Sequence, residues 1–169
     1  MKYNLVYADF YTNYVALVKE APIEKALSKN TEEFLDLLDD IPGSMINHAY
    51  GEGKWTVKEV LQHIIDAERV FSYRIIRIAR LDGTPMASFD ENKWMENANT
   101  AKRKWSDMVK EFKFLRKSNL LMIADFSKEQ LNATGTASNQ PVSTAALCYI
   151  LAGHVKHHMN ILKERYLKK

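Results

Sequence analysis

Apolar side chains recur at the three- and four-residue spacing of an amphipathic helix in four separate stretches of the chain. The first stretch runs from about Pro22, a residue that suits a helix start, to about Asp40. The others cover residues from about 56 to 81, 99 to 124 and 142 to 166. Since no convincing strand pattern is present, four helices of this length predict an all-α four-helix bundle.

The segment before the first helix, residues 1–21, alternates only weakly between polar and apolar positions. It ends in Ala21-Pro22, which is a poor helix interior. We expect an irregular N-terminal arm that packs on the bundle. With no internal repeat and no sign of a second domain, residues 1–169 are expected to form a single domain.

Two longer connections differ in character. Residues 84–98, between the second and third helices, contain Phe89, Trp94 and Met95, which predicts a lid-like connection instead of free coil. Residues 127–140 are polar and small, and they predict a long surface connection before the last helix.

The second helix has the clearest start in the chain. Thr56-Val57-Lys58-Glu59 has the pattern of a capping box, in which the Thr56 hydroxyl accepts from the Glu59 amide and the Glu59 carboxylate reaches back. Further along this helix, Glu68 falls among apolar positions. We expect it to be partly buried with a partner, in a structural ion pair or a carbonyl-capping role in preference to a catalytic one.

Charge and composition exclude some function classes. The 24 Lys and Arg residues are scattered among 21 Asp and Glu residues, and no basic run is longer than Lys102-Arg103-Lys104. This distribution is not a nucleic-acid footprint, so we expect no nucleic-acid partner. No stretch approaches the ~20 apolar residues that a membrane span requires, so we expect no membrane partner.

The single cysteine, Cys148, excludes an internal disulfide and fits a reducing compartment. Its apolar helical neighbours favour a buried small hydrophobe over a reactive thiol. The N-terminus has no apolar core followed by a small-residue cleavage site. We therefore expect a cytoplasmic protein.

Three of the five histidines lie within the window 154–158. His154 and His158 are one helical turn and about 40° apart, and both fall on the apolar stripe of the last helix. A buried imidazole needs a polar partner, and one shared divalent metal ion would satisfy both rings. The simpler alternative is a core histidine with one hydrogen bond. His157 falls at the margin of the stripe. It is expected to be a surface residue, and the alternative is a proton shuttle near the metal.

A third ligand has to come from another helix, and His63 is the candidate. It lies two turns into the second helix, at the edge of the apolar face, so it points obliquely into the bundle. Three histidines would leave coordination positions free, which is the pattern of catalytic sites and not of closed structural ones. His48 has no periodic context and is expected at the surface.

Two segments resemble the motifs of a known family. Residues 55–71, Trp-Thr-Val-Lys-Glu-Val-Leu-Gln-His and onward, resemble the first metal-ligand helix of the DinB-like (YfiT-like) family. Residues 153–162 resemble that family's last helix with its HxxxH pair, and the two motifs are separated by about 90 residues, as in the family. The resemblance runs from about Pro22 to Tyr166.

This resemblance implies a DinB-type four-helix bundle, often a homodimer, with a nickel or zinc site formed by His63, His154 and His158. Such an ion can lower the pKa of a bound water to ~7, or it can hold a thiolate. Family members include thiol S-transferases and a thiol-dependent isomerase. We favour a metal-dependent hydrolase acting on a small molecule. The alternatives are a low-molecular-weight-thiol S-transferase and a non-catalytic, stress-related metal- or ligand-binding protein.

The sequence assigns no catalytic residue. Glu59 and Asp66 flank His63 at one-turn spacing, but capping and a solvated charge explain them equally well. Among the tryptophans we expect Trp94 to be a neighbour of the site.

A thiol transferase needs cations at the mouth of its site to hold the carboxylates of a thiol. Arg74, Lys54 and Arg69 are the candidates for this role.

Overall fold

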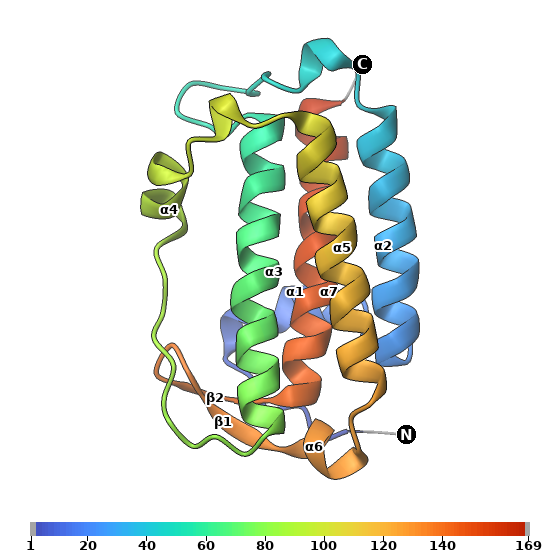
Figure 1. Cartoon of the computed structure of the whole chain (residues 1–169), viewed down its shortest axis with the longest axis vertical. Coiled ribbons are helices and arrows are strands. Elements are labelled where there is room, and N and C mark those ends of the chain that lie inside the picture. The colour runs from blue at the N-terminus through green and yellow to red at the C-terminus, as the bar shows by residue number, and fades with distance from the viewer. Residues whose placement is uncertain (1–2, 168–169) are drawn as a thin grey trace.

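The computed structural model of the chain describes residues 3–167 (Figure 1). It confirms the four predicted helices: α2 (Ile23–Asp40), α3 (Val57–Ala79), α5 (Trp105–Ala124) and α7 (Thr144–Ile161), which continues as a π-helical turn over Leu162–Tyr166. None of the helices in this described part is long and apolar enough to cross a membrane.

The direction of the helices makes this an unusual bundle. Figure 1 shows α2 and α7 running one way and α3 and α5 running the other way. Around the bundle, α2 packs on α7, α7 on α3, α3 on α5, and α5 on α2. Because α3 and α5 are parallel neighbours, their connection must return along the whole length of the bundle. The predicted lid-like segment is this crossover.

The crossover is ordered at both ends. Near its start, the Met86 amide donates to the Thr136 carbonyl at 2.9 Å, and the Ser138 amide donates to the Met86 carbonyl at 2.9 Å. Further along, it forms the short helix α4 (Glu91–Asn97), which is capped by the Asp90 side chain. α5 begins at Trp105 and not near residue 99 as predicted, because the extended backbone of Arg103 and Lys104 separates it from a 3₁₀ turn over Thr100–Lys102.

The surface connection before the last helix contains secondary structure that the sequence did not predict. It forms α6 (Lys128–Asn132) and a hairpin of β1 (Thr134–Ala137) and β2 (Gln140–Ser143). The expectation of a strand-free chain was wrong here because four-residue strands are too short to show a period. The turn residues Ser138 and Asn139 both have positive φ, which is the twist that a two-residue hairpin loop requires.

The N-terminal arm, expected to be irregular, contains a 3₁₀ turn (Asp9–Tyr11) and the helix α1 (Thr12–Ala16). Residues 1–2 of the predicted arm lie outside the described part. α1 packs directly on α7 at Gly153, where an added Cβ would lie 2.0 Å from the Tyr14 carbonyl oxygen. The glycine is therefore required for α1 to approach α7 beside His154.

Two apolar clusters fill the bundle, one toward each end. Between them lies a layer of buried polar side chains, contributed by all four long helices. Its members are Asn30, Glu68, Arg116, Asn119 and His154. Cys148 is fully buried in the first of these clusters, where desolvation raises the pKa of its thiol, as expected for a small core side chain.

Candidate metal centre

The start of α3 is held by the predicted capping box. The Glu59 amide donates to the Thr56 hydroxyl at 3.2 Å, and the Thr56 amide donates to the Glu59 carboxylate at 2.7 Å. Glu59 is thus committed to the cap. The box sets where α3 begins, and it thereby sets the direction in which His63 points.

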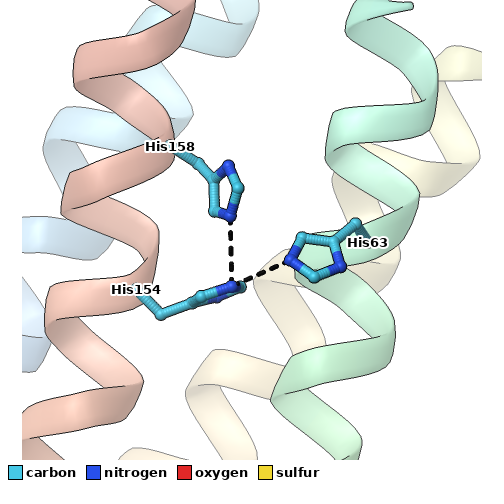
Figure 2. Close-up of side chains that lie close together, drawn as sticks. All are labelled: His63, His154 and His158. Atoms are coloured by element: carbon cyan, nitrogen blue, oxygen red, sulfur yellow. Dashed lines mark hydrogen bonds between the residues drawn. The ribbon is translucent and has the colours of Figure 1, made fainter. Parts of the chain in front are cut away.

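His63, His154 and His158 converge between α3 and α7 (Figure 2). The Nε2 atom of His154 lies 2.9 Å from Nε2 of His63 and 3.1 Å from Nε2 of His158. His154 and His158 are buried, and His63 is partly exposed. The structure therefore brings together the three residues that the sequence singled out.

Three neutral imidazoles in this arrangement cannot all be satisfied by one another. A neutral ring nitrogen carries either one hydrogen or one lone pair. The Nε2 atom of His154 therefore makes one full hydrogen bond at a time, although two other Nε2 atoms lie within reach. One of the three Nε2 atoms is left without a partner among the imidazoles, and a shared cation would resolve this conflict.

The electrostatic environment keeps these rings neutral. Burial lowers the pKa of His63 to about 4, and it lowers the pKa of His154 and of His158 well below 6.5. The neighbouring imidazoles lower the pKa of His154 and His158 further. The charge of Glu91, at the start of α4, acts in the opposite direction on the pKa of His63. At neutral pH each ring therefore has a lone pair to offer a metal ion.

The spacing of the nitrogens is near that of a metal-ligand set. A tetrahedral ion with bonds of 2.0–2.1 Å holds its nitrogen ligands ~3.3 Å apart. Small outward rotations of the rings would convert the observed separations of 2.9 and 3.1 Å to that value. Three neutral nitrogen ligands suit zinc or nickel and leave at least one coordination position open.

Aromatic side chains surround the histidines. The ring of Trp55 lies 5.0 Å from His63, and the rings of Tyr14 and Phe71 lie 5.6 and 5.8 Å from His154. The expectation that Trp94 is the neighbouring tryptophan was wrong. It lies on α4, is 44 % exposed and packs on Phe89, because the crossover places this part of α4 on the outer flank of α3.

A cleft of about 270 Å³ opens to the surface beside this site. His158 forms part of its wall. The polar and aromatic residues that also line it are Tyr50, Lys54, Trp55, Asn92, Arg165 and Tyr166.

Of the three cations predicted at the mouth, only Lys54 lines this cleft. Arg74 is buried and donates to the Ala87 carbonyl at 2.7 Å and the Ser138 hydroxyl at 3.0 Å, so it fastens the crossover to the hairpin. Arg69 forms an ion pair with Glu111.

Of the remaining candidates, Asp66 and His48 stand apart from the convergence point, whereas His157 lies next to it. Asp66 accepts from the Gln62 amide at 3.0 Å, and His48 is exposed. His157 is partly buried, and its ring lies 5.1 Å from Tyr14 and 5.2 Å from His158.

Glu68 is almost fully buried in an ion pair with Arg116, which is the structural role that the sequence favoured. It also accepts from the Asn119 amide at 2.9 Å.

Sequence reasoning missed Tyr14 and Arg165. Arg165 follows His158 by seven residues, a two-turn spacing that could have placed it on the same side of the last helix. Tyr14 offered no such signal because its position depends on the packing of α1 on α7.

Comparisons with known proteins agree with this architecture. The sequence matches the DinB superfamily over residues 26–162. A search of curated proteins found no match.

Among solved structures, one similar fold is YfiT from Bacillus subtilis, described as a probable metal-dependent hydrolase with an unusual four-helix bundle topology. It is 15 % identical with a TM-score of 0.70, and the match covers 97 % of this chain and 90 % of that one. Another is the mycothiol-dependent maleylpyruvate isomerase, 14 % identical with a TM-score of 0.68. That match covers 83 % of this chain and 60 % of that one. At these identities the likeness shows a shared fold.

Proposed function

The chain belongs to the DinB superfamily, and from this membership and the histidine cluster we propose that it is a metal-dependent enzyme. One nickel or zinc ion is held by His63, His154 and His158. The observation that carries this proposal is the position of the His154 Nε2 atom, which two other imidazole nitrogens approach within 3.1 Å. A divalent ion is the partner that accepts all three lone pairs at once.

We propose hydrolysis of a small molecule as the reaction. Bound at such a site, the ion supplies Lewis acidity and lowers the pKa of a water or a thiol. The chain contributes the rest. Its three imidazoles stay neutral, Trp55 and Tyr14 pack against His63 and His154, and the cleft beside His158 admits the substrate. The description of YfiT as a probable metal-dependent hydrolase supports this reading.

The second candidate is transfer or isomerisation that depends on a low-molecular-weight thiol. The structural neighbour described as mycothiol-dependent favours it, because a similar fold there serves a thiol-dependent reaction. The two candidates share the metal site and differ in what enters the cleft.

The first experiment measures the metal content of untagged protein by elemental mass spectrometry. We expect about one nickel or zinc ion per chain, lost in His63→Ala. His48→Ala removes an exposed histidine away from the cluster and should keep the metal. No metal in the wild type after incubation with both ions would refute the proposal.

The second experiment separates the reactions. The metal-loaded protein is tested against a panel of esters, amides and lactones, and its thermal stability is measured with saturating low-molecular-weight thiols. Turnover that disappears in His158→Ala supports hydrolysis, and stabilisation by thiols supports the second candidate. If metal is bound but no substrate turns over and no thiol stabilises the protein, a non-catalytic binding protein would be favoured.

A further inference from the structure

The cleft beside His158 is basic. Lys54 and Arg165 line it from two different segments, and its lining residues include no Asp or Glu. Two carboxylates act on groups around the site, Glu91 on His63 and Tyr14 and Glu59 on Tyr166, but neither of them lines this cleft. A ligand entering here therefore meets positive charge before it reaches the histidines.

These two cations differ from the arginines on the flank of the bundle. Arg69, Arg77 and Arg103 each form an ion pair with a carboxylate. Within residues 3–167, neither Lys54 nor Arg165 has such a partner. Carboxylates of the chain balance the charges of the flank arginines, whereas the two cations of the cleft are available to pair with an anionic ligand.

The position of Arg165 is set by a chain of contacts that ends at the histidines. Its guanidinium donates to the Tyr50 hydroxyl at 3.1 Å and lies over the Tyr50 ring at 5.6 Å. The Tyr50 ring packs edge-on against Tyr166 at 4.8 Å, and the Tyr166 hydroxyl donates to the Trp55 carbonyl at 2.7 Å. Since Trp55 also contacts His63, the guanidinium is held at a defined place relative to the three imidazoles.

A cation near the end of α7 has a simpler explanation, because basic residues are favoured in the last turn of a helix. That explanation applies to Lys163 as well as to Arg165. It does not apply to Lys54, which belongs to the turn after Gly51. Lys54 is far from Arg165 in the sequence, yet the two side chains line the same cleft.

We propose that Lys54 and Arg165 recognise a carboxylate on a small molecule whose other end reaches the ion held by the histidines. The inference rests on the proposed function and names its substrate class: a compact anionic molecule. A guanidinium offers a planar pair of donors that matches a carboxylate, and Lys54 adds a second charge. A cleft of about 270 Å³ is of a size that suits a small molecule.

The test uses the protein loaded with Co²⁺, in which thiolate binding to the ion produces a charge-transfer absorption. Two probes are titrated, 3-mercaptopropionate and 2-mercaptoethanol, and both affinities are expressed per thiolate. They share a thiol and differ in the carboxylate. The proteins compared are the wild type, Lys54→Gln, Arg165→Gln and the double variant. Lys163→Gln is the matched control, an exposed cation in the same final turn that does not line the cleft.

We expect each single substitution to weaken 3-mercaptopropionate binding about 3- to 10-fold, and the double variant to weaken it further. The affinity of each variant for 2-mercaptoethanol should change less than about twofold, and so should the affinity of the control variant for either probe. Added salt should reduce the preference of the wild type for the charged probe. If cobalt binds but the substitutions leave both probes unaffected, carboxylate recognition is refuted and the metal site stands. If the wild type binds no cobalt, both proposals fail.

Discussion

Two clusters of buried polar side chains bridge the helices of this bundle, and they are built differently. Glu68, Arg116 and Asn119 combine a carboxylate with two donors, so the charges cancel within the cluster. His63, His154 and His158 are three copies of the same neutral group. Opposite groups form a stable pair without help, whereas identical groups pointing at one another need something between them. The first cluster is therefore structural, and the second has the form of a site.

The buried ion pair is incompletely satisfied. The Nε and Nη1 atoms of Arg116 have no hydrogen-bond partner within the described residues. Its guanidinium lies 5.5 Å from the centre of the Phe112 ring, and its Nη2 atom also donates to the Leu151 carbonyl at 3.3 Å. Burial raises the pKa of Glu68, and the positive charge of Arg116 opposes that shift. No comparable opposite charge lies within the histidine cluster.

The largest effect is expected from breaking the structural cluster. Arg116→Met leaves Glu68 buried without its counter-charge, and we expect the free energy of unfolding to fall by about 3–5 kcal/mol. Urea denaturation of the metal-free protein measures this. The double variant Glu68→Leu/Arg116→Met should recover most of the loss, since a buried pair is worth little more than apolar side chains of similar volume. A single variant as stable as the wild type would contradict this account.

The histidine cluster should gain its stability from metal. With free zinc at about 100 times its dissociation constant, we expect the free energy of unfolding to rise by about 2.7 kcal/mol. In His154→Ala the protein should remain helical by circular dichroism but show no stabilisation by zinc. Arg116→Met provides the contrast, because it should lose stability yet still respond to the ion. Complete unfolding of His154→Ala would indicate a structural metal instead.

The histidine cluster should also make the free energy of unfolding depend on pH. The pKa of His63 is about 4 in the folded protein and 6.5 when unperturbed, so between these values the unfolded chain binds more protons. The free energy of unfolding of the metal-free protein should change little between pH 6.5 and about 8, and it should fall as the pH decreases from 6.5 toward 4. The contribution of His63 is about 3 kcal/mol. Denaturation at several pH values measures it, and His63→Gln should show a shallower slope. An unchanged slope would rule out His63 as the source.

The smallest effect concerns the support of the site. Thr56→Ala removes the hydroxyl that caps α3, and we expect a loss of about 1 kcal/mol in the free energy of unfolding. Since His63 lies two turns from this cap, zinc affinity should fall by less than about tenfold, which calorimetric titration detects. Thr56→Ser keeps the cap and should behave like the wild type. A larger fall in affinity would mean that the cap positions His63 more directly than its hydrogen bonds indicate.

The elements that depend on local pattern could be predicted from the sequence alone. The four long helices follow from apolar periodicity, and the start of α3 follows from Thr56 and Glu59, whose interaction spans a single turn. The convergence of His154 and His158 follows from their spacing on one helix. In each case the interacting residues are neighbours along the chain, so a few positions contain all the information.

The approach of His63 to the last helix could be predicted from its place on α3, but the folded bundle alone shows most features that depend on segments far apart in the chain. It selected Lys54 in place of Arg69 and Arg74 at the cleft, because the latter two are engaged by other parts of the chain. It also placed Trp55 and not Trp94 beside the histidines. The short hairpin and α1 form where they do because contacts such as Met86 with Ser138, and Tyr14 with Gly153, stabilise them. These contacts exist only once the bundle has formed, and no local pattern records them.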